Sequence, residues 1–193
     1  MATSAKNPAE IDNEVRRSLD LVRAGAENVK ADYFRLTTTY DTSGIVRERV
    51  FCYELYHQMR LLMGEEVSLF LHGEIDKHGH RDFSALDQKN PDFVLHVPGT
   101  HEGNTLVIEV KGTIGYPRSK YVADFNNLIT FVTRYRYRAG LFLLYNHSMA
   151  ALKRIIIPPE DFENRAVWGR IYILALEKPG DRCTESSLES ICV

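Results

Sequence analysis

The sequence predicts a mixed α/β domain in which helices cover a central sheet. Two long segments, one ending at Gly64 and one running from Pro117 to Gly140, repeat apolar residues at helical spacing. Three shorter runs of apolar residues lie between them and indicate strands. The apolar run "LFLLYN" follows the second helix as a buried strand. The predicted order is therefore helix, three strands, helix, strand.

The size and composition of the chain suit a single globular domain. It has 193 residues, of which 44% are apolar and 26% charged. No stretch reaches the roughly 20 consecutive apolar residues of a membrane helix. The opening "MATSAKNPAEIDNEVRRSLD" also lacks the apolar core of a secretion signal. We therefore expect a cytoplasmic protein with no membrane partner.

Charge and cysteine content limit the kinds of site that the chain can carry. The net charge is −2, so any binding to nucleic acid would depend on a local basic patch. The three cysteines are odd in number and lack the pair spacing of a zinc site. A disulfide framework or a cysteine-based metal site is not expected.

The N-terminal extension, residues 1–44, precedes the core domain. Residues 8–24 place Ile11, Val15, Leu19 and Val22 at helical spacing, which predicts an amphipathic helix packed on the core. The stretch 32–42 is ambiguous between helix and strand.

The core domain, residues 45–178, begins with the first core helix. Side chains at 41–43 can cap its start, and Gly64 ends it. Its apolar stripe consists of Phe51, Cys52, Leu55, Met59 and Leu62. The three strands that follow are "EVSLFLHGEI", "DFVLHVP" and "TLVIEVK", with a polar loop before the second and the turn "GTHEGN" before the third.

The second long helix starts near Pro117 and carries an apolar stripe through Tyr135. After the strand "LFLLYN", we expect further strands at "RIIIPP" and "GRIYILALE". Residues 179–193 form a C-terminal tail with little periodicity.

Three charged side chains are placed where two predicted strands meet. Because alternate residues of a strand share a face, Glu109 and Lys111 point one way while the apolar residues between them point the other. Asp92 stands at the start of the preceding strand. If the two strands form a hairpin, Asp92 lies beside Glu109 and Lys111.

Carboxylates and an ammonium in one cluster suit phosphodiester hydrolysis. Carboxylate oxygens bind Mg²⁺ or Mn²⁺, and substrate phosphate oxygens commonly complete the coordination. Such a cation polarises a phosphoryl group and lowers the pKa of a bound water, while Lys111 could stabilise the developing charge or orient that water.

With these residues the sequence resembles the PD-(D/E)xK nuclease superfamily. Pro91 and Asp92 match the first half of its signature, and Glu109, Val110 and Lys111 match the second half, seventeen positions after Asp92. The predicted order of elements is also similar to the αβββαβ core of that superfamily. The resemblance covers roughly residues 45–147.

The resemblance implies a restriction-endonuclease-like fold, with a central mixed sheet flanked by helices, an N-terminal helical extension and C-terminal strands. It implies an endonuclease or other nuclease that hydrolyses DNA with Mg²⁺ or Mn²⁺. RNA is an alternative substrate that the resemblance does not exclude. Asp92 and Glu109 would bind the metal, and Lys111 would act near the attacking water. By fold-level analogy, such a chain acts as a homodimer or as a subunit of a restriction, repair or phage-defence complex.

The family usually adds an acidic residue from its first helix, and two residues compete for this role. Glu48 lies near the centre of the apolar stripe, but an acid in a first turn already complements the helix dipole. Glu54 lies at the stripe's edge beside Gln58, so Glu54 is expected to be the catalytic, metal-binding acid and Gln58 its neighbour. Glu74, after the first strand, is an additional candidate by analogy with some family members.

Nucleic-acid contacts are expected from two basic groups. The second helix of the family often presents a polar or basic residue to the substrate. Arg118, Lys120 and Asp124 lie in its first turns here, and Lys120 is the first choice. The run "RYRYR" contributes Arg134, Arg136 and Arg138, which could contact phosphates. Alternatively, these arginines complement the C-terminal end of the helix dipole while Tyr135 is buried.

Other interpretations stay open from the sequence alone. The domain could be a catalytically inactive nuclease-like fold that binds nucleic acid or a protein partner, or an unrelated α/β interaction domain. In the latter case Asp92 caps a strand and Glu109 and Lys111 form an exposed ion pair. His72, His78 and His80 could bind a transition metal, but their spacing favours a solvated loop.

Overall fold

The structure is a computed structural model. It describes residues 7–37, 39–40, 44–64, 69–73, 90–99, 101–113 and 115–192, except for the side chain of His101. The site candidate Glu74, the histidines His78 and His80 and the beginning of the first predicted strand lie outside the described residues.

The predicted succession of helix, three strands, helix and strand is confirmed. It consists of α3 (Glu48–Met63), β1 (Phe70–Gly73), β2 (Phe93–His96), β3 (Asn104–Lys111), α4 (Arg118–Thr133) and β4 (Ala139–Tyr145). The two helices form because apolar residues recur every three or four positions and bury one face of each. In α3 this face consists of Phe51, Cys52, Leu55 and Met59.

One open, mixed sheet of six strands organises the described part of the chain. Its spatial order follows the sequence, from β1 through β5 (Ile171–Leu176) to β6 (Thr184–Ser187). β1, β2 and β3 pair antiparallel, β3, β4 and β5 pair parallel, and β6 returns antiparallel to β5. The parallel step from β3 to β4 requires a crossover, which α4 supplies.

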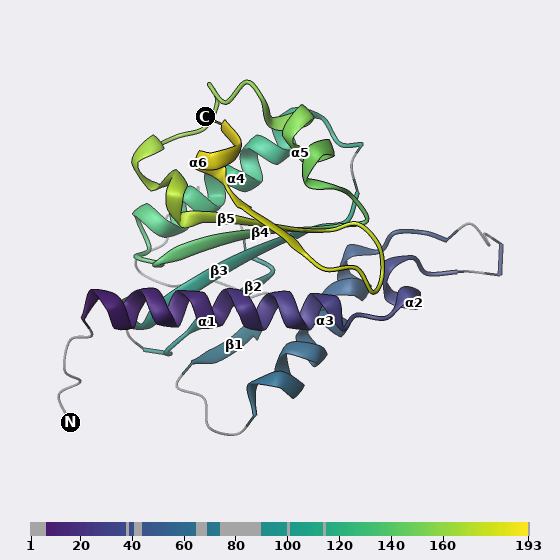
Figure 1. Ribbon diagram of the computed structural model, residues 1–193, viewed down its shortest axis with the longest axis horizontal. Coiled ribbons are helices and arrows are strands. Elements are labelled where there is room, and N and C mark those ends of the chain that lie inside the picture. The colour runs from purple at the N-terminus through teal and green to yellow at the C-terminus, as the bar shows by residue number, and fades with distance from the viewer. Residues whose placement is uncertain are drawn as a thin grey trace.

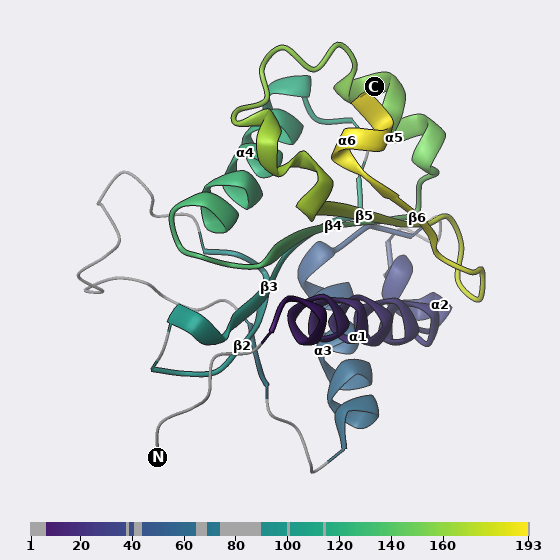
Figure 2. The same ribbon diagram turned by 60° about the vertical axis from the view of Figure 1, so that its left-hand side comes forward.

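Helices cover both faces of this sheet, in three layers (Figures 1 and 2). On one face lie α1 (Pro8–Glu27), α2 (Ala31–Phe34) and α3, packed on strand residues such as Leu106, Ile108 and Val110. On the other lie α4, α5 (Met149–Ile156) and α6 (Leu188–Cys192), packed on residues such as Val107 and Phe142. The alternation of side chains along each strand thus divides the core into two clusters.

The predicted N-terminal helix is confirmed as α1 and packs closely on α3. Val15, Leu19 and Val22 are buried, and a capping box between Asn7 and Glu10 defines its start. Gly25 permits the close approach, because a Cβ there would lie 2.8 Å from Cγ of Met59.

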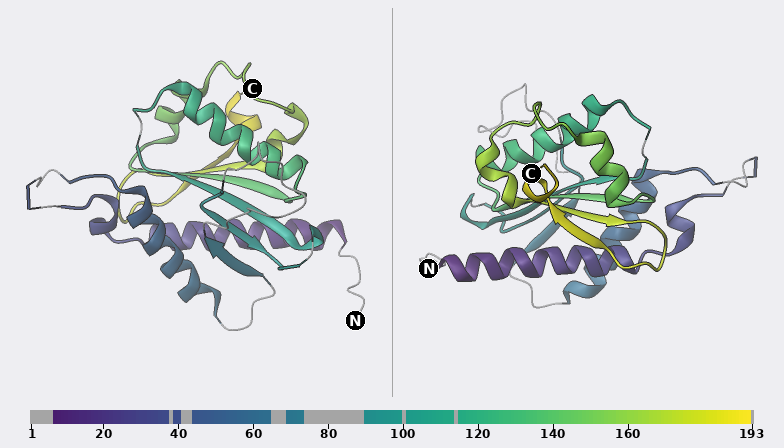
Figure 3. Two further views of the ribbon diagram at one scale, coloured as in Figure 1. Left: turned by 180° about the vertical axis from the view of Figure 1, so that it is seen from behind. Right: turned by 45° about the horizontal axis from the view of Figure 1, so that its top comes forward.

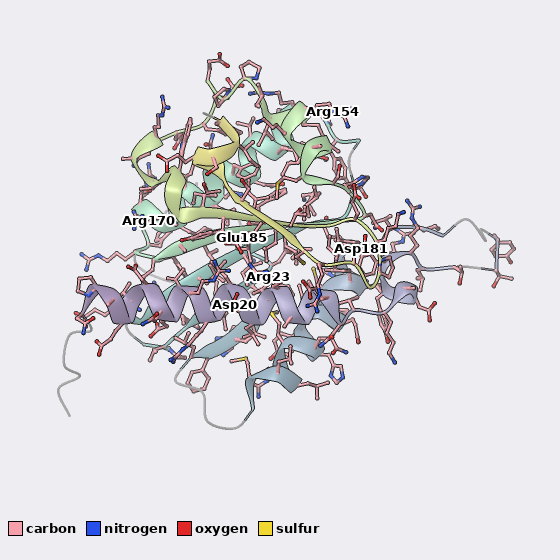
Figure 4. The ribbon with its side chains drawn as sticks, in the orientation of Figure 1. Asp20, Arg23, Arg154, Arg170, Asp181 and Glu185 are labelled. Atoms are coloured by element: carbon pink, nitrogen blue, oxygen red, sulfur yellow. The ribbon has the colours of Figure 1, made fainter. Side chains whose placement is uncertain are left out.

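Ion pairs connect α1 to the last strand of the sheet. Figure 4 shows Asp20 and Arg23 of α1 close to Glu185 of β6. Glu185 accepts hydrogen bonds from Arg23 and from Arg16, whose Nη2 lies 2.8 Å from Oε2. The N-terminal and C-terminal parts of the chain therefore meet on one side of the sheet.

Two C-terminal expectations differ from the structure. The strand predicted at "RIIIPP" is wrong, because residues up to Ile156 belong to α5, which Ser148 caps and which buries Leu152 and Ile156 one turn apart. The C-terminal tail also contributes regular structure. β6 pairs with β5 through backbone hydrogen bonds, and α6 buries Leu188 and Ile191.

The predicted strand at "GRIYILALE" is confirmed as β5. In the described part of the chain, no helix combines the length and the apolar character that crossing a membrane requires.

Candidate active site

The predicted hairpin between the second and third strands is present and brings Asp92 to the end of β3. Phe93 pairs with Ile108, so Asp92, the preceding residue, lies next to Glu109. A hydrogen bond fixes this arrangement, since the backbone N–H of Val110 donates to Oδ2 of Asp92 at 2.7 Å. Asp92 therefore meets the end of β3 through its side chain as well as through the strand register.

Glu109 is a buried carboxyl group in the middle layer of the fold. It is 9% exposed, and its neighbours in β3 belong to the apolar core. Burial raises the pKa of Glu109 well above its ordinary value, and the nearby charges of Asp92 and Asp124 raise it further. A buried acid without a full counter-charge is costly, which is characteristic of a functional position.

Asp92 is perturbed in the same direction. Burial raises the pKa of Asp92 to about 6, against the lowering effect of the hydrogen bond from Val110, and the charge of Glu48 adds to the rise. Near pH 6, a bound cation would therefore compete with a proton for this carboxylate.

Lys111 bridges the two helical layers through ion pairs. Its Nζ lies 3.3 Å from Oδ2 of Asp124 in α4 and 3.6 Å from Oε1 of Glu48 in α3. Burial alone would lower the pKa of Lys111, but the carboxylates of Glu48 and Asp124 outweigh it and raise the pKa. The ammonium is therefore charged at neutral pH and is held at the end of β3.

The structure brings Glu48, rather than Glu54, to this cluster. Besides its ion pair with Lys111, Glu48 accepts a hydrogen bond from the backbone N–H of Gly112, with Oε2 and N 3.2 Å apart. Glu54 instead accepts from Nε2 of Gln58 at 2.7 Å, one turn along α3. The predicted Glu54–Gln58 pair exists, but neither residue contributes to the contacts described for the cluster.

The sequence also indicated Glu48, because it lies near the centre of the apolar stripe of the first core helix. Its position in the first turn favoured a role in stabilising the helix dipole instead. Glu48 precedes the buried residues Cys52, Leu55 and Met59 by four, seven and eleven positions, so it shares their stripe. That stripe faces the sheet, and its first residue therefore reaches the end of β3. Stabilisation of the helix terminus and a role at the site are compatible.

Asp124 and Tyr145 complete the cluster. Asp124 is one of the three residues considered in the first turns of the second helix, ranked below Lys120, and Tyr145 was not predicted as a site residue. Asp124 lies three residues after the buried Tyr121 in α4, which turns its carboxylate towards Lys111. The Tyr145 ring stacks on Phe51 at 3.8 Å between centroids. Among the described residues, the buried Tyr145 hydroxyl has no hydrogen-bond partner.

Tyr145 also lies against the end of β3. A Cβ on Gly112 would lie only 2.1 Å from Cζ of Tyr145, so this position admits only glycine without rearrangement. The charge of Glu48 is a secondary cause, after burial, of the raised pKa of the Tyr145 hydroxyl. The hydroxyl is therefore within electrostatic reach of the acidic cluster.

The basic residues predicted to contact nucleic acid occupy two separate places. Arg118 and Lys120 lie in the first turn of α4. Arg118 pairs with Asp161, whereas Nζ of Lys120 lies 4.3 Å from the centroid of the Tyr116 ring, which Lys111 also approaches. The run from Arg134 to Arg138 follows the end of α4, beside the start of β3.

The run "RYRYR" is therefore not brought to the carboxylates. Arg138 donates its backbone N–H to Asn104, the first residue of β3, and pairs with Glu14 through its guanidinium at 2.8 Å. The eight residues of β3 separate this end from Lys111 by about 23 Å. Tyr135 and Tyr137 are buried, as the structural interpretation of this run expected for Tyr135.

A cavity opens beside the acidic cluster. Its volume is about 670 Å³, and its lining residues come from α3, β1 and the start of β2. The left view of Figure 3 shows α3 and this edge of the sheet side by side. The lining residues are Glu48, Arg49, Cys52, Tyr53, Tyr56, His72, Gly73, Asp92 and Phe93. Two of the site carboxylates therefore face a space large enough for a small ligand.

The donor set fits a hard cation held by two carboxylates. Within the described ranges, no three His, Cys, Asp or Glu side chains gather closely enough to hold a metal ion by themselves. His72 and His96 form a pair, with Nδ1 and Nε2 2.9 Å apart, but no third ligand joins them in the described structure. Mg²⁺ commonly uses one or two carboxylates together with water and substrate phosphate, and Asp92 and Glu109 suit this mode.

Comparison with known proteins adds no relative, since no family model, no curated protein and no solved structure matches the chain.

Proposed function

We propose that the protein is a metal-dependent nuclease that hydrolyses DNA phosphodiester bonds, with a restriction-endonuclease-like core. One observation carries the proposal: Asp92, Glu109 and Lys111 meet at the ends of two paired strands, where both carboxyl pKa values are raised. Burying two acids beside one lysine disfavours the ionised state, and a divalent cation would offset that cost.

Each residue of the cluster can take a defined role. Asp92 and Glu109 would hold Mg²⁺ or Mn²⁺, which when bound supplies an activated water and polarises the phosphoryl group. The Lys111 ammonium would stabilise negative charge that develops on the phosphate oxygens. Glu48 and Asp124 fix Lys111 in position and keep it charged, because each forms an ion pair with it.

The arrangement of elements supports the same proposal. The helix α3, the strands β1 to β3, the helix α4 and the strand β4 follow the αβββαβ order, and their strands are adjacent in the sheet. The carboxyl end of β3 lies next to that of the parallel strand β4, a usual position for sites in α/β sheets.

One observation favours a second candidate, a nuclease-like domain that binds nucleic acid without cleaving it. The ammonium of Lys111 is paired with two carboxylates, so part of its charge is already compensated within the protein. In this case the acidic cluster would have a structural role only.

A cleavage assay separates the two candidates. Supercoiled plasmid and labelled oligonucleotides are incubated with the wild type, Glu109→Gln and Lys111→Met in Mg²⁺, in Mn²⁺ and in EDTA. The nuclease proposal expects cleavage by the wild type that needs the cation and is lost in both variants. Cleavage that persists in the variants would contradict it, and binding without cleavage would support the second candidate.

A further inference from the structure

The cavity beside Glu48 and Asp92 has two walls of different chemistry. At one end are the carboxylates of Asp92, one of the two proposed metal ligands, and of Glu48. Along α3, Tyr53 and Tyr56 line the cavity, three positions apart and hence on the same side of the helix. The cavity therefore joins the phosphate-cleaving end to an aromatic wall.

The aromatic wall is partly rigid and partly exposed. The centroids of the Tyr56 and Phe93 rings lie 6.3 Å apart, with 26° between the ring planes, so Phe93 of β2 packs beside Tyr56 and also lines the cavity. Tyr53 is 64% exposed, so its ring is accessible to a ligand. Arg49 lines the same space and adds a positive charge one turn before Tyr53.

We propose that this cavity binds an unpaired nucleobase of single-stranded DNA, next to the phosphodiester bond that the metal site would hold at Asp92. The inference rests on the proposed nuclease function and specifies its substrate class. Flat aromatic side chains stack on any base, and such stacking is the common means of binding single strands without sequence readout. Arg49 supplies a charge suited to the DNA backbone.

The energetic cost of extruding a base from a duplex favours an unpaired base as the occupant of the cavity. A paired base lies inside the duplex stack and reaches a pocket only after extrusion, which costs stacking and pairing energy. A single strand does not carry that cost. The cavity volume of about 670 Å³ is in the range of sites that enclose small organic ligands, and a nucleobase is of that class.

A binding experiment tests this inference without relying on cleavage. Fluorescence anisotropy in EDTA compares three labelled probes of about 12 nucleotides, a length typical of single-strand sites: oligo-dT, its duplex with oligo-dA, and an abasic strand of equal charge. We expect oligo-dT to bind about 10-fold more tightly than the other two.

Variants then identify the aromatic wall. Tyr53→Ala should lower the affinity for oligo-dT about 10-fold and leave the affinity for the abasic strand unchanged. Tyr53→Phe should keep the wild-type affinity for both probes. Because Tyr53 is largely exposed, the alanine variant should fold, which thermal unfolding checks. Tyr40→Ala, at a tyrosine that is 99% exposed and outside the cavity lining, is the matched control.

The outcomes separate this inference from the proposed function. Equal binding of oligo-dT and abasic strand, tighter binding of the duplex, no measurable binding of oligo-dT, or an unchanged affinity in Tyr53→Ala would overturn the inference. A preference for oligo-dT in a protein that cleaves nothing would sustain the inference while removing the nuclease. Cleavage of DNA by a protein that has no preference for unpaired bases would support the nuclease proposal and contradict the inference.

Discussion

Glu109 shows why individual side chains of the cluster are costly to the fold. It lies in a strand whose other residues are almost all buried, and its carboxyl group shares its surroundings with Asp92 and Asp124. The charges of Asp92 and Asp124 raise the pKa of Glu109, Asp124 also raises the pKa of Asp92, and Lys111 lowers both pKa values. Repulsion between buried acids is expected where function, rather than stability, selects the residues.

The pH dependence of stability should reveal the cost at Asp92. Its pKa is about 6 in the folded protein against an ordinary value of 3.8, so the unfolded chain loses this proton first. Folding stability is therefore lost as pH rises from about 4 to 6, by an amount on the order of 3 kcal/mol. Asp92→Asn should remove that loss, because an amide oxygen can still accept from Val110.

Chemical denaturation without divalent cations checks this expectation at both ends of the window. Asp92→Asn should be more stable than the wild type at pH 7 and close to it near pH 4. A variant that is destabilised equally at both pH values would show that the carboxyl group is not strained in the folded state.

A pair of isosteric variants distinguishes the two acids of α3. Glu48→Gln weakens the ion pair with Lys111 while keeping the shape of the side chain, so cleavage should fall by about 10- to 100-fold, as for supporting residues of metal sites. Glu54→Gln changes a group that bonds to Gln58 and should leave the rate near that of the wild type. The measurement is the initial rate of plasmid cleavage in Mg²⁺, and the reverse ranking would restore Glu54 as the helix acid.

At the scale of elements, the end of β3 is where three parts of the fold converge. Glu48 of α3 and Asp124 of α4 approach Lys111 from the two helical layers, and Tyr145 of β4 packs against Gly112. The Tyr145 ring also contacts Phe34 edge-on and stacks on Phe51, so α2 and α3 support it. The site therefore depends on packing around one glycine.

Gly112→Ala should disturb this convergence. The added methyl group would overlap the Tyr145 ring, which is fully buried, so we expect a loss of stability of about 1 to 3 kcal/mol and reduced cleavage. Gly115→Ala is a suitable control, because a Cβ there meets nothing closer than Cγ2 of Thr113 at 4.0 Å. Urea denaturation compares them, and equal stability of the two variants would contradict the packing argument.

At the scale of the whole molecule, local patterns predicted more of the fold than of the site. The hairpin of β2 and β3 was predictable because its turn and its alternating side chains are local in sequence. Glu48 and Lys111 form an ion pair although they are 63 positions apart in the sequence. This contact depends on how α3 lies on the sheet, and the periodicity of apolar residues does not predict that placement.

The errors at the C-terminus have similar causes. "RIIIPP" contains β-branched residues that favour strands, but Ser148 caps a helix whose buried face decides its conformation. β6 has the sequence Thr-Glu-Ser-Ser, which lacks an apolar alternation, and only its pairing with β5 makes it a strand. Tertiary contacts thus override weak local preferences in both segments.

Binding of Mn²⁺ to the protein without nucleic acid tests the central claim most directly, because it asks whether Asp92 and Glu109 form a cation site. Electron paramagnetic resonance measures free Mn²⁺ during titration of the wild type, Glu109→Gln and the control Glu54→Gln at pH 8, above the raised pKa of Asp92. We predict one bound Mn²⁺ per chain in the wild type and in Glu54→Gln, and its loss in Glu109→Gln. Equal binding by Glu109→Gln and the wild type, or no binding by the wild type, would contradict the claim.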